Sequence, residues 1–165
     1  MANAFPQAIG TQANFPGRQV IALCGDGGFT MLMGDMLTLI QQKLPVKIIV
    51  FNNGTLGFVE MEMKASGFLD SGVELVNPNF ARLAEAAGLF GRRVEDPEDL
   101  SDAIRLMMLH DGPALLDVVT ARQELAMPPK TSSARVAKFS MWLLKAVLNG
   151  RGDQVIDLAR TNLLR

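Results

Sequence analysis

Four short runs of strand-forming character alternate with helical patterns in the first 120 residues of this 165-residue chain. The runs are rich in β-branched residues or leucine, and they occupy residues 19–24, 46–51, 91–94 and 114–119. Near-continuous apolar character is typical of parallel strands that are buried on both faces. Strands that alternate with helices predict a doubly wound α/β fold, in which a mostly parallel sheet has helices on both faces.

Helical patterns are predicted between these strands at 30–44, 77–88 and 96–110. In the first pattern, one face would carry Leu32, Met36, Leu39 and Ile40. The other two patterns open on a polar residue followed by proline, which predicts Asn77 and Asp96 as N-caps. Gly88 is the predicted C-cap of the second helix.

Composition supports a globular core, because 48% of the residues are hydrophobic and 20% are charged. No apolar run reaches the roughly 18 residues that a membrane-spanning helix needs. The single cysteine, Cys24, excludes an internal disulfide and predicts a reducing, cytoplasmic location.

The C-terminal part of the chain departs from the alternating pattern. Paired prolines and serines predict a linker at 124–133, which would separate a domain at 1–123 from a helical tail at 134–165. Residues 1–129 carry a net charge of −6, whereas residues 130–165 carry +5. Such a basic tail predicts an anionic partner, either nucleic acid or a membrane.

The first tail helix is predicted to be amphipathic, with Trp142 on its polar side. Its apolar face would carry Val136, Phe139, Leu143, Leu144, Val147 and Leu148. This helix would either lie in a membrane interface or pack against another domain or subunit.

The segment Gly25-Asp26-Gly27-Gly28 follows the first predicted strand. In an open α/β sheet, ligands bind at this end of the strands, and the helix predicted to start near Thr30 would favour a phosphate there. Asp26 would repel a phosphate unless a cation lay between them, so the pattern predicts a bridging metal. Magnesium is the default, because it prefers carboxylate and phosphate oxygens.

A second polar turn, at 51–58, ends the next strand and should lie at the same edge of the sheet. Asn53 can offer its side-chain oxygen, and Gly54 lets a following main-chain carbonyl turn inward. Each turn alone is also explained by the ordinary turn preference of Asp-Gly and Asn-Gly pairs. Their occurrence together, each at the end of a strand, favours a shared binding site.

Gly25-Asp26-Gly27 followed after 24 residues by Asn52-Asn53 resembles the signature of thiamine-diphosphate-dependent enzymes. The resemblance implies that Mg²⁺ is held by Asp26, the side chain of Asn53 and the main-chain oxygen of Thr55. It also implies that the cofactor site includes Gly25, Gly27, Gly28 and Gly57. The opening segment MANAFPQAIG is similar to the family segment whose methionine supports the bent thiamine, a position that Met1 matches. Ala2 and Ala4 stand where the family has glycines.

The segments GDGGF, LPVKIIVFNN, LGFVEMEMK and GRGDQVIDLARTNLLR are similar to the quinone-reducing bacterial pyruvate dehydrogenases, or pyruvate oxidases. This likeness implies that Phe58 and Val59 line the active site and that Glu62 is an acid–base residue. It further implies that pyruvate is converted to acetate and CO2, with electrons passing through FAD to a quinone. A homotetramer is implied as well, with a lipid-binding tail that would hold the enzyme on the inner face of the cell membrane.

In that family the glutamate that activates thiamine comes from an N-terminal domain of a partner chain, and a middle domain holds most of the FAD. Neither domain precedes Met1, so the resemblance predicts that the chain is a fragment, inactive alone, or a subunit that needs a partner. The alternatives are a domain of an acetolactate synthase or a 2-oxo acid decarboxylase, or a non-catalytic module that binds diphosphate and magnesium. With this resemblance, nucleic acid is no longer an expected partner of the basic tail.

Overall fold

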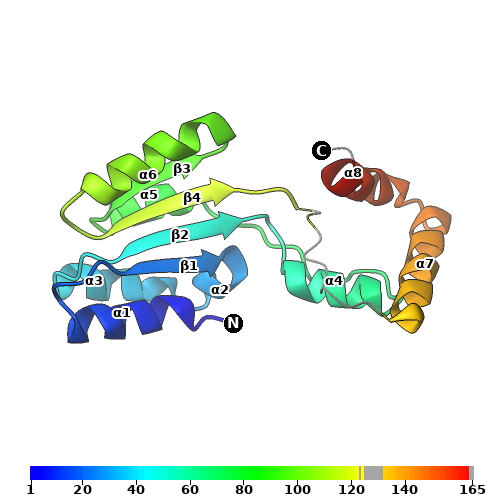
Figure 1. The fold of residues 1–165 in the computed structure, drawn as a ribbon, viewed down its shortest axis with the longest axis horizontal. Helices are drawn as coiled ribbons and strands as arrows, with labels where there is room; N and C mark the ends of the chain where they lie inside the picture. The colour runs from blue at the N-terminus through cyan, green and yellow to red at the C-terminus, as the bar shows by residue number, and fades with distance from the viewer. Residues whose placement is uncertain (123, 125–131, 164–165) are drawn as a thin grey trace. The chain divides into compact units, whose positions relative to one another are not determined.

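The computed structural model describes residues 1–122, 124 and 132–163. The chain divides into two compact units, drawn in Figure 1. Unit 1 contains residues 1–54 and 76–120, and unit 2 contains residues 55–75 and 121–165. The domain boundary predicted at residue 123 stays a prediction.

Unit 1 is built on a four-stranded, entirely parallel sheet. Its strands are β1 (Ile21–Gly25), β2 (Lys47–Asn52), β3 (Phe90–Val94) and β4 (Ala114–Val119), in the order β1-β2-β4-β3. All four strands were predicted, and the α/β fold class is confirmed. Because the strands run in the same direction, the segments that follow them gather at one edge of the sheet.

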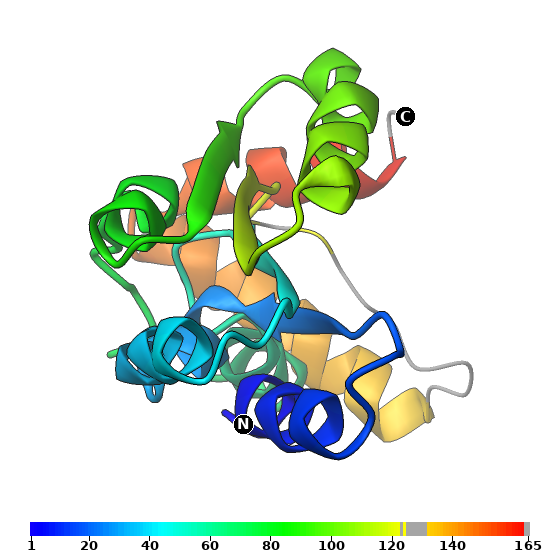
Figure 2. The ribbon, with the colours of Figure 1, turned by 90° about the vertical axis from the view of Figure 1, so that its left-hand side faces the viewer.

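Helices cover both faces of this sheet, as Figure 2 shows along the strands. They are α1 (Ala4–Asn14), α2 (Asp26–Thr30), α3 (Met36–Gln41), α5 (Phe80–Ala86) and α6 (Leu100–Leu109), with 3-10 turns η1 (Met33–Asp35) and η2 (Pro97–Asp99). The larger core cluster joins Phe5, Phe29 and Phe80 to the buried side of β1 and β2. On the other face, Met107 of α6 packs against Leu116 of β4.

The single helix predicted at 30–44 is wrong, because α2 ends at Thr30 and the segment after it contains the short elements η1 and α3. Gly34 lies in the 3-10 turn, and glycine is among the poorest residues in a helix interior. The break also changes the buried face. Met36 and Leu39 are buried, whereas Leu32 and Ile40 are 40% and 39% exposed.

The cap predicted at Asn77 is also wrong, since α5 begins three residues later. Asn79 is the N-cap, and its side-chain oxygen accepts a hydrogen bond from the Arg82 N–H at 3.0 Å. The side chain of Asn77 is not available as a cap, because its amide donates to Asp26 and to Asn52. Asp96 does act as a cap, because its carboxylate accepts from the Glu98 N–H at 2.9 Å as Pro97 opens η2.

We predict that Gly91→Ala lowers the free energy of unfolding by about 1–3 kcal/mol. A Cβ at Gly91 of β3 would lie 2.2 Å from the Ala81 carbonyl oxygen of α5, so strand and helix would have to separate. Gly10→Ala is the matched control, because Gly10 lies in α1 with open space around it. This variant should raise the free energy of unfolding by roughly 0.5–1 kcal/mol. Urea unfolding of both variants tests this. A Gly91→Ala chain as stable as the wild type would contradict the close packing.

Unit 2 contains α4 (Gly57–Ala65), α7 (Ser133–Leu148) and α8 (Gly152–Leu163). Helices α7 and α8 lie within the tail predicted to be helical at 134–165, apart from Ser133, which precedes it by one residue. The linker predicted at 124–133 lies largely outside the described residues. Within the part of the chain that the structure describes, no helix combines the length and the apolar character needed to span a membrane.

The orientation predicted for α7 is wrong. Trp142 is fully buried in a cluster with Ala146 and Leu158, and the Lys64 ammonium lies 5.0 Å from the Trp142 ring centroid. Four residues of the predicted apolar face are instead more than half exposed, namely Val136, Leu144, Val147 and Leu148. The helix packs on α4 and α8 through its aromatic side, because one large ring buries more apolar area than a branched side chain.

Candidate functional site

The carboxylate of Asp26 lies at the carboxyl edge of the sheet in unit 1. Asp26 directly follows the last residue of β1 and opens α2, so the helix at this site begins four residues before Thr30. Only 3% of Asp26 is exposed. Its Oδ1 accepts a hydrogen bond from the Gly27 N–H at 2.8 Å. Its Oδ2 accepts two, from the Gly54 N–H at 2.8 Å and from Asn77 Nδ2 at 2.8 Å.

A buried polar network continues from Asp26 across the neighbouring strands. Asn77 Nδ2 also donates to Oδ1 of Asn52, the last residue of β2, at 2.9 Å. Asn52 Nδ2 donates in turn to Asp117 Oδ1 of β4 at 2.9 Å. The second oxygen of Asp117 accepts from Arg93 Nη1 of β3 at 2.6 Å and from the Phe80 N–H at 3.2 Å. The network therefore links all four strands to Asp26.

The sequence-based prediction missed Asn77, Asp117 and Arg93 in this network. Asp117 carries a signal that could have been used, because a carboxylate inside the apolar run ALLDVV needs a buried partner. Asp117 is fully buried, and Arg93 is its ion-pair partner. The hydrogen bonds to Glu95 and Asp117 raise the pKa of Arg93, with Glu95 contributing most.

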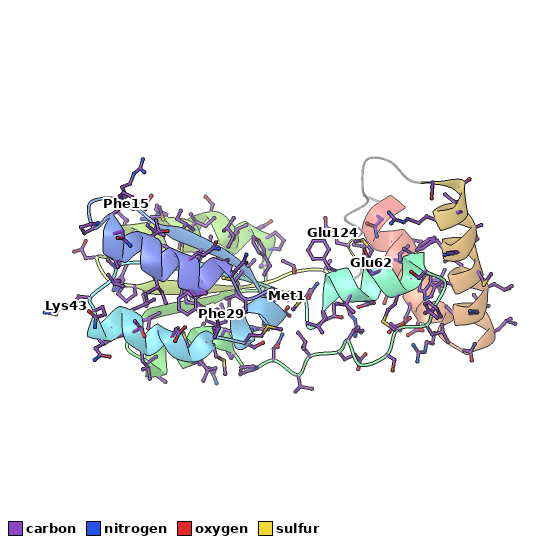
Figure 3. The ribbon with its side chains drawn as sticks, turned by 90° about the horizontal axis from the view of Figure 1, so that it is seen from below. Met1, Phe15, Phe29, Lys43, Glu62 and Glu124 are labelled. Atoms are coloured by element: carbon purple, nitrogen blue, oxygen red, sulfur yellow. The ribbon has the colours of Figure 1, made fainter. Side chains whose placement is uncertain are left out.

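The predicted cofactor residues of unit 1 lie together. The Gly25–Gly28 turn contacts the start of the chain, because a Cβ on Gly28 would lie 3.4 Å from the Ala2 nitrogen. Met1, labelled in Figure 3, is 70% exposed and precedes that contact. Asn53 follows β2 and is half-buried. The predicted roles of these residues stay predictions.

The remaining predicted residues belong to unit 2. Thr55 is buried, and its hydroxyl donates to Glu60 Oε2 at 2.7 Å. Gly57 begins α4, and Phe58 and Val59 beside it are 74% and 41% exposed. Glu62 projects from α4 as an exposed carboxylate (Figure 3). The buried carboxylate of this helix is that of Glu60, which pairs with Lys64. The roles predicted for Thr55, Gly57, Phe58, Val59 and Glu62 stay predictions.

The chemistry of unit 1 fits a magnesium ion. A carboxylate has about four acceptor positions, and the described contacts of Asp26 use three of them, which leaves one on Oδ1. Among the described residues, no group of three or more His, Cys, Asp and Glu could hold a metal. A cation here would therefore depend on Asp26 together with amide, main-chain and diphosphate oxygens, which is the hard donor set that Mg²⁺ prefers.

We predict that Cys24, two residues before Asp26, is slow to react with thiol reagents in the folded chain. Burial raises the pKa of its thiol to about 11, so the thiol stays protonated at neutral pH. Because the thiolate is the reactive form, the labelling rate should rise roughly tenfold per pH unit up to about pH 11. Labelling with an aromatic disulfide, with and without urea, checks this. Rapid labelling of the folded chain at pH 7.5 would contradict it.

The family model described as "Thiamine pyrophosphate enzyme, C-terminal TPP binding domain" matches residues 1–118, which include the whole Asp26 network. The chain belongs to this family. The thiamine-diphosphate signature predicted from Gly25-Asp26-Gly27 and Asn52-Asn53 is thereby confirmed at the level of the family.

Several relatives have names that refer to this cofactor or to enzymes of 2-oxo acids. "Putative thiamine pyrophosphate-containing protein YdaP" of Bacillus subtilis is 36% identical over 98% of this chain and 28% of its own length. The acetolactate synthase of the same organism is 35% identical over 70% of this chain and 20% of its own. A solved structure, the thiamine diphosphate-dependent 4-hydroxybenzoylformate decarboxylase of Rhodococcus jostii RHA1, has a TM-score of 0.68 and 34% identity, covering 73% of this chain and 23% of that one.

The names of these relatives bear on the expectation that the chain comes from a pyruvate oxidase. The chain spans between a fifth and three tenths of their length. Their names support a thiamine-diphosphate enzyme in general, and acetolactate synthases and a decarboxylase more directly than a pyruvate oxidase.

Proposed function

We propose that this chain binds thiamine diphosphate through Mg²⁺ as part of an enzyme that decarboxylates a 2-oxo acid. The observation that carries the proposal is the buried Asp26 carboxylate, which lies in a Gly-rich turn and keeps one acceptor position on Oδ1. Membership of the thiamine pyrophosphate family, through residues 1–118, supports the identity of the cofactor.

When bound, thiamine diphosphate supplies the electron sink for breaking the bond between a carbonyl carbon and its carboxylate. The task of the chain is to bind and orient. Asp26, with the side chain of Asn53 and the main-chain oxygen of Thr55, would hold the metal that neutralises the diphosphate. Gly27 and Gly28 leave room for the diphosphate beside the turn. The hydrogen bonds to Asp26 fix its carboxylate before any ligand arrives.

Acetolactate synthesis is the better-supported reaction among the alternatives. Seven relatives named as acetolactate synthases are 32–36% identical over 70–82% of this chain. Both acetolactate synthesis and simple decarboxylation begin with the loss of CO2 from a 2-oxo acid, which makes pyruvate the first substrate to test.

Oxidation of pyruvate to acetate, with electrons passing through FAD to a quinone, is the second candidate. The observation that favours it is the likeness of the segments LGFVEMEMK and GRGDQVIDLARTNLLR to the pyruvate oxidases. The predicted lipid contact and place at the inner membrane face belong to this candidate, whereas the predicted homo-oligomer is compatible with either.

A chimaera separates the two candidates. The segment of the Bacillus subtilis acetolactate synthase that matches this chain would be exchanged for the chain, and the products formed from pyruvate would be measured with Mg²⁺ and thiamine diphosphate. Acetolactate supports the first candidate, and acetate formed together with quinone reduction supports the second. A folded chimaera that consumes no pyruvate would contradict both. The chain on its own should not turn pyruvate over.

A further inference from the structure

We infer that Asn77 is a positioning residue for the metal site: it occupies Oδ2 of Asp26, so that Oδ1 is the oxygen presented to the cation. This inference rests on the proposed function, because it concerns the Mg²⁺ that Asp26 would hold. Within the described residues, the Asn77 amide donates to Asp26 and to Asn52, so Asn77 would act on the metal through Asp26.

The orientation of the Asn77 amide follows from the two carboxylates at the ends of the network. An ionised carboxylate only accepts hydrogen bonds. Asn52 must therefore turn its NH2 group towards Asp117, which leaves its oxygen facing Asn77. Asn77 must then present its own NH2 group, and its two hydrogens are divided between Asn52 Oδ1 at 2.9 Å and Asp26 Oδ2 at 2.8 Å.

The two oxygens of Asp26 are consequently not equivalent. Oδ2 accepts from Asn77 and from the Gly54 N–H, which fills both of its acceptor positions. Oδ1 accepts from the Gly27 N–H and keeps one position. A cation can therefore reach one oxygen of Asp26 without displacing a hydrogen bond, and binding through both oxygens would require Asn77 to move.

Binding through one oxygen discriminates between cations. Mg²⁺ demands near-octahedral geometry with short metal–oxygen bonds, whereas Ca²⁺ accepts six to eight ligands and commonly takes both oxygens of one carboxylate. By occupying Oδ2, Asn77 would favour Mg²⁺ over Ca²⁺. Partners behind a metal ligand typically change metal affinity by about 10- to 100-fold when they are removed.

The chain provides a matched control two residues away. Asn79 belongs to the same loop and caps α5, but its side chain bonds to the Arg82 N–H rather than to Asp26. Asn77→Ala and Asn79→Ala should both lower the unfolding stability of unit 1. Asn77→Ala alone should alter the metal preference.

The experiment is a calorimetric titration of the full chain with thiamine diphosphate at a series of Mg²⁺ or Ca²⁺ concentrations, for the wild type and both variants. We expect Asn77→Ala to raise the Mg²⁺ concentration for half-saturation about 10-fold and to change that for Ca²⁺ by less than about 3-fold. Asn79→Ala should leave the ratio of the two values as in the wild type.

The role of Asn77 is overturned if its alanine variant shifts both metals equally or shifts neither, while the wild type still requires Mg²⁺. It is equally overturned if Asn79→Ala changes the metal preference as much as Asn77→Ala does. A wild-type chain that binds thiamine diphosphate without any divalent cation would contradict the proposed function itself, and this role with it.

Discussion

Replacing Asp26 with asparagine should weaken the magnesium-dependent binding of thiamine diphosphate by at least roughly 100-fold. The substitution removes the charge that balances the cation. It also introduces an NH2 group among three donors, the N–H groups of Gly27 and Gly54 and the Asn77 amide, so at least one buried donor loses its acceptor. Calorimetric titration at saturating Mg²⁺ gives the comparison.

Asp35→Asn is the matched control for this substitution. Asp35 is a half-exposed carboxylate of η1 in the same segment, and its variant should bind thiamine diphosphate as the wild type does. If Asp26→Asn kept wild-type affinity in the presence of Mg²⁺, the metal would not depend on this carboxylate. Circular dichroism of both variants would show whether a loss of binding reflects a loss of fold.

Replacing Asp117 with alanine should lower the free energy of unfolding by about 3–5 kcal/mol. Asp117 is fully buried and accepts hydrogen bonds from Asn52, from Arg93 and from the first N–H of α5. Without its carboxylate these donors lose their acceptor inside unit 1, and each unsatisfied buried donor costs about 1–3 kcal/mol. Urea unfolding of the full chain measures the loss.

Asp102→Ala tests whether the large effect depends on burial. Like Asp117, Asp102 forms ion pairs with arginine, in its case with Arg105 and Arg92. These arginines lower the pKa of its carboxyl, and Arg105 contributes more. Its ion pairs lie on the surface, where solvent screens them, so this variant should unfold close to the wild type. Equal losses of unfolding free energy for Asp102→Ala and Asp117→Ala would contradict the claim that the buried network stabilises unit 1.

The sheet could be predicted from the sequence because short runs rich in β-branched residues or leucine alternate with helical patterns. Each of the four runs lies within two residues of the observed strand at both ends. Burial on both faces was expected for all four strands, but it holds for most of β4 only, because β1 alternates between exposed and buried residues and β3 is mostly half-buried. Helices α1 and α4 were not predicted as elements. Pro6 and Gly10 weaken the helical pattern of α1, and tertiary packing on β1 provides what local propensity lacks.

The candidate site could be predicted only in part. Asp26 and Asn53 follow directly from the ends of two strands, because strand direction brings those ends to one edge. Spacing alone cannot tell which polar side chain turns inward when two lie close together. Asn77 and Asn79 flank one proline, and tertiary contacts assign the cap to Asn79 and the network to Asn77. In α4, likewise, Glu60 is buried and Glu62 is exposed.

The most direct test of the central claim is a calorimetric titration of the wild-type chain with thiamine diphosphate, once with Mg²⁺ and once with a chelator in its place. We predict saturable binding that requires the cation, because Asp26 would otherwise face the diphosphate as a like charge. Binding of equal affinity in the chelator, or no binding with Mg²⁺, would contradict the assignment of Asp26 as the anchor of a magnesium–diphosphate site.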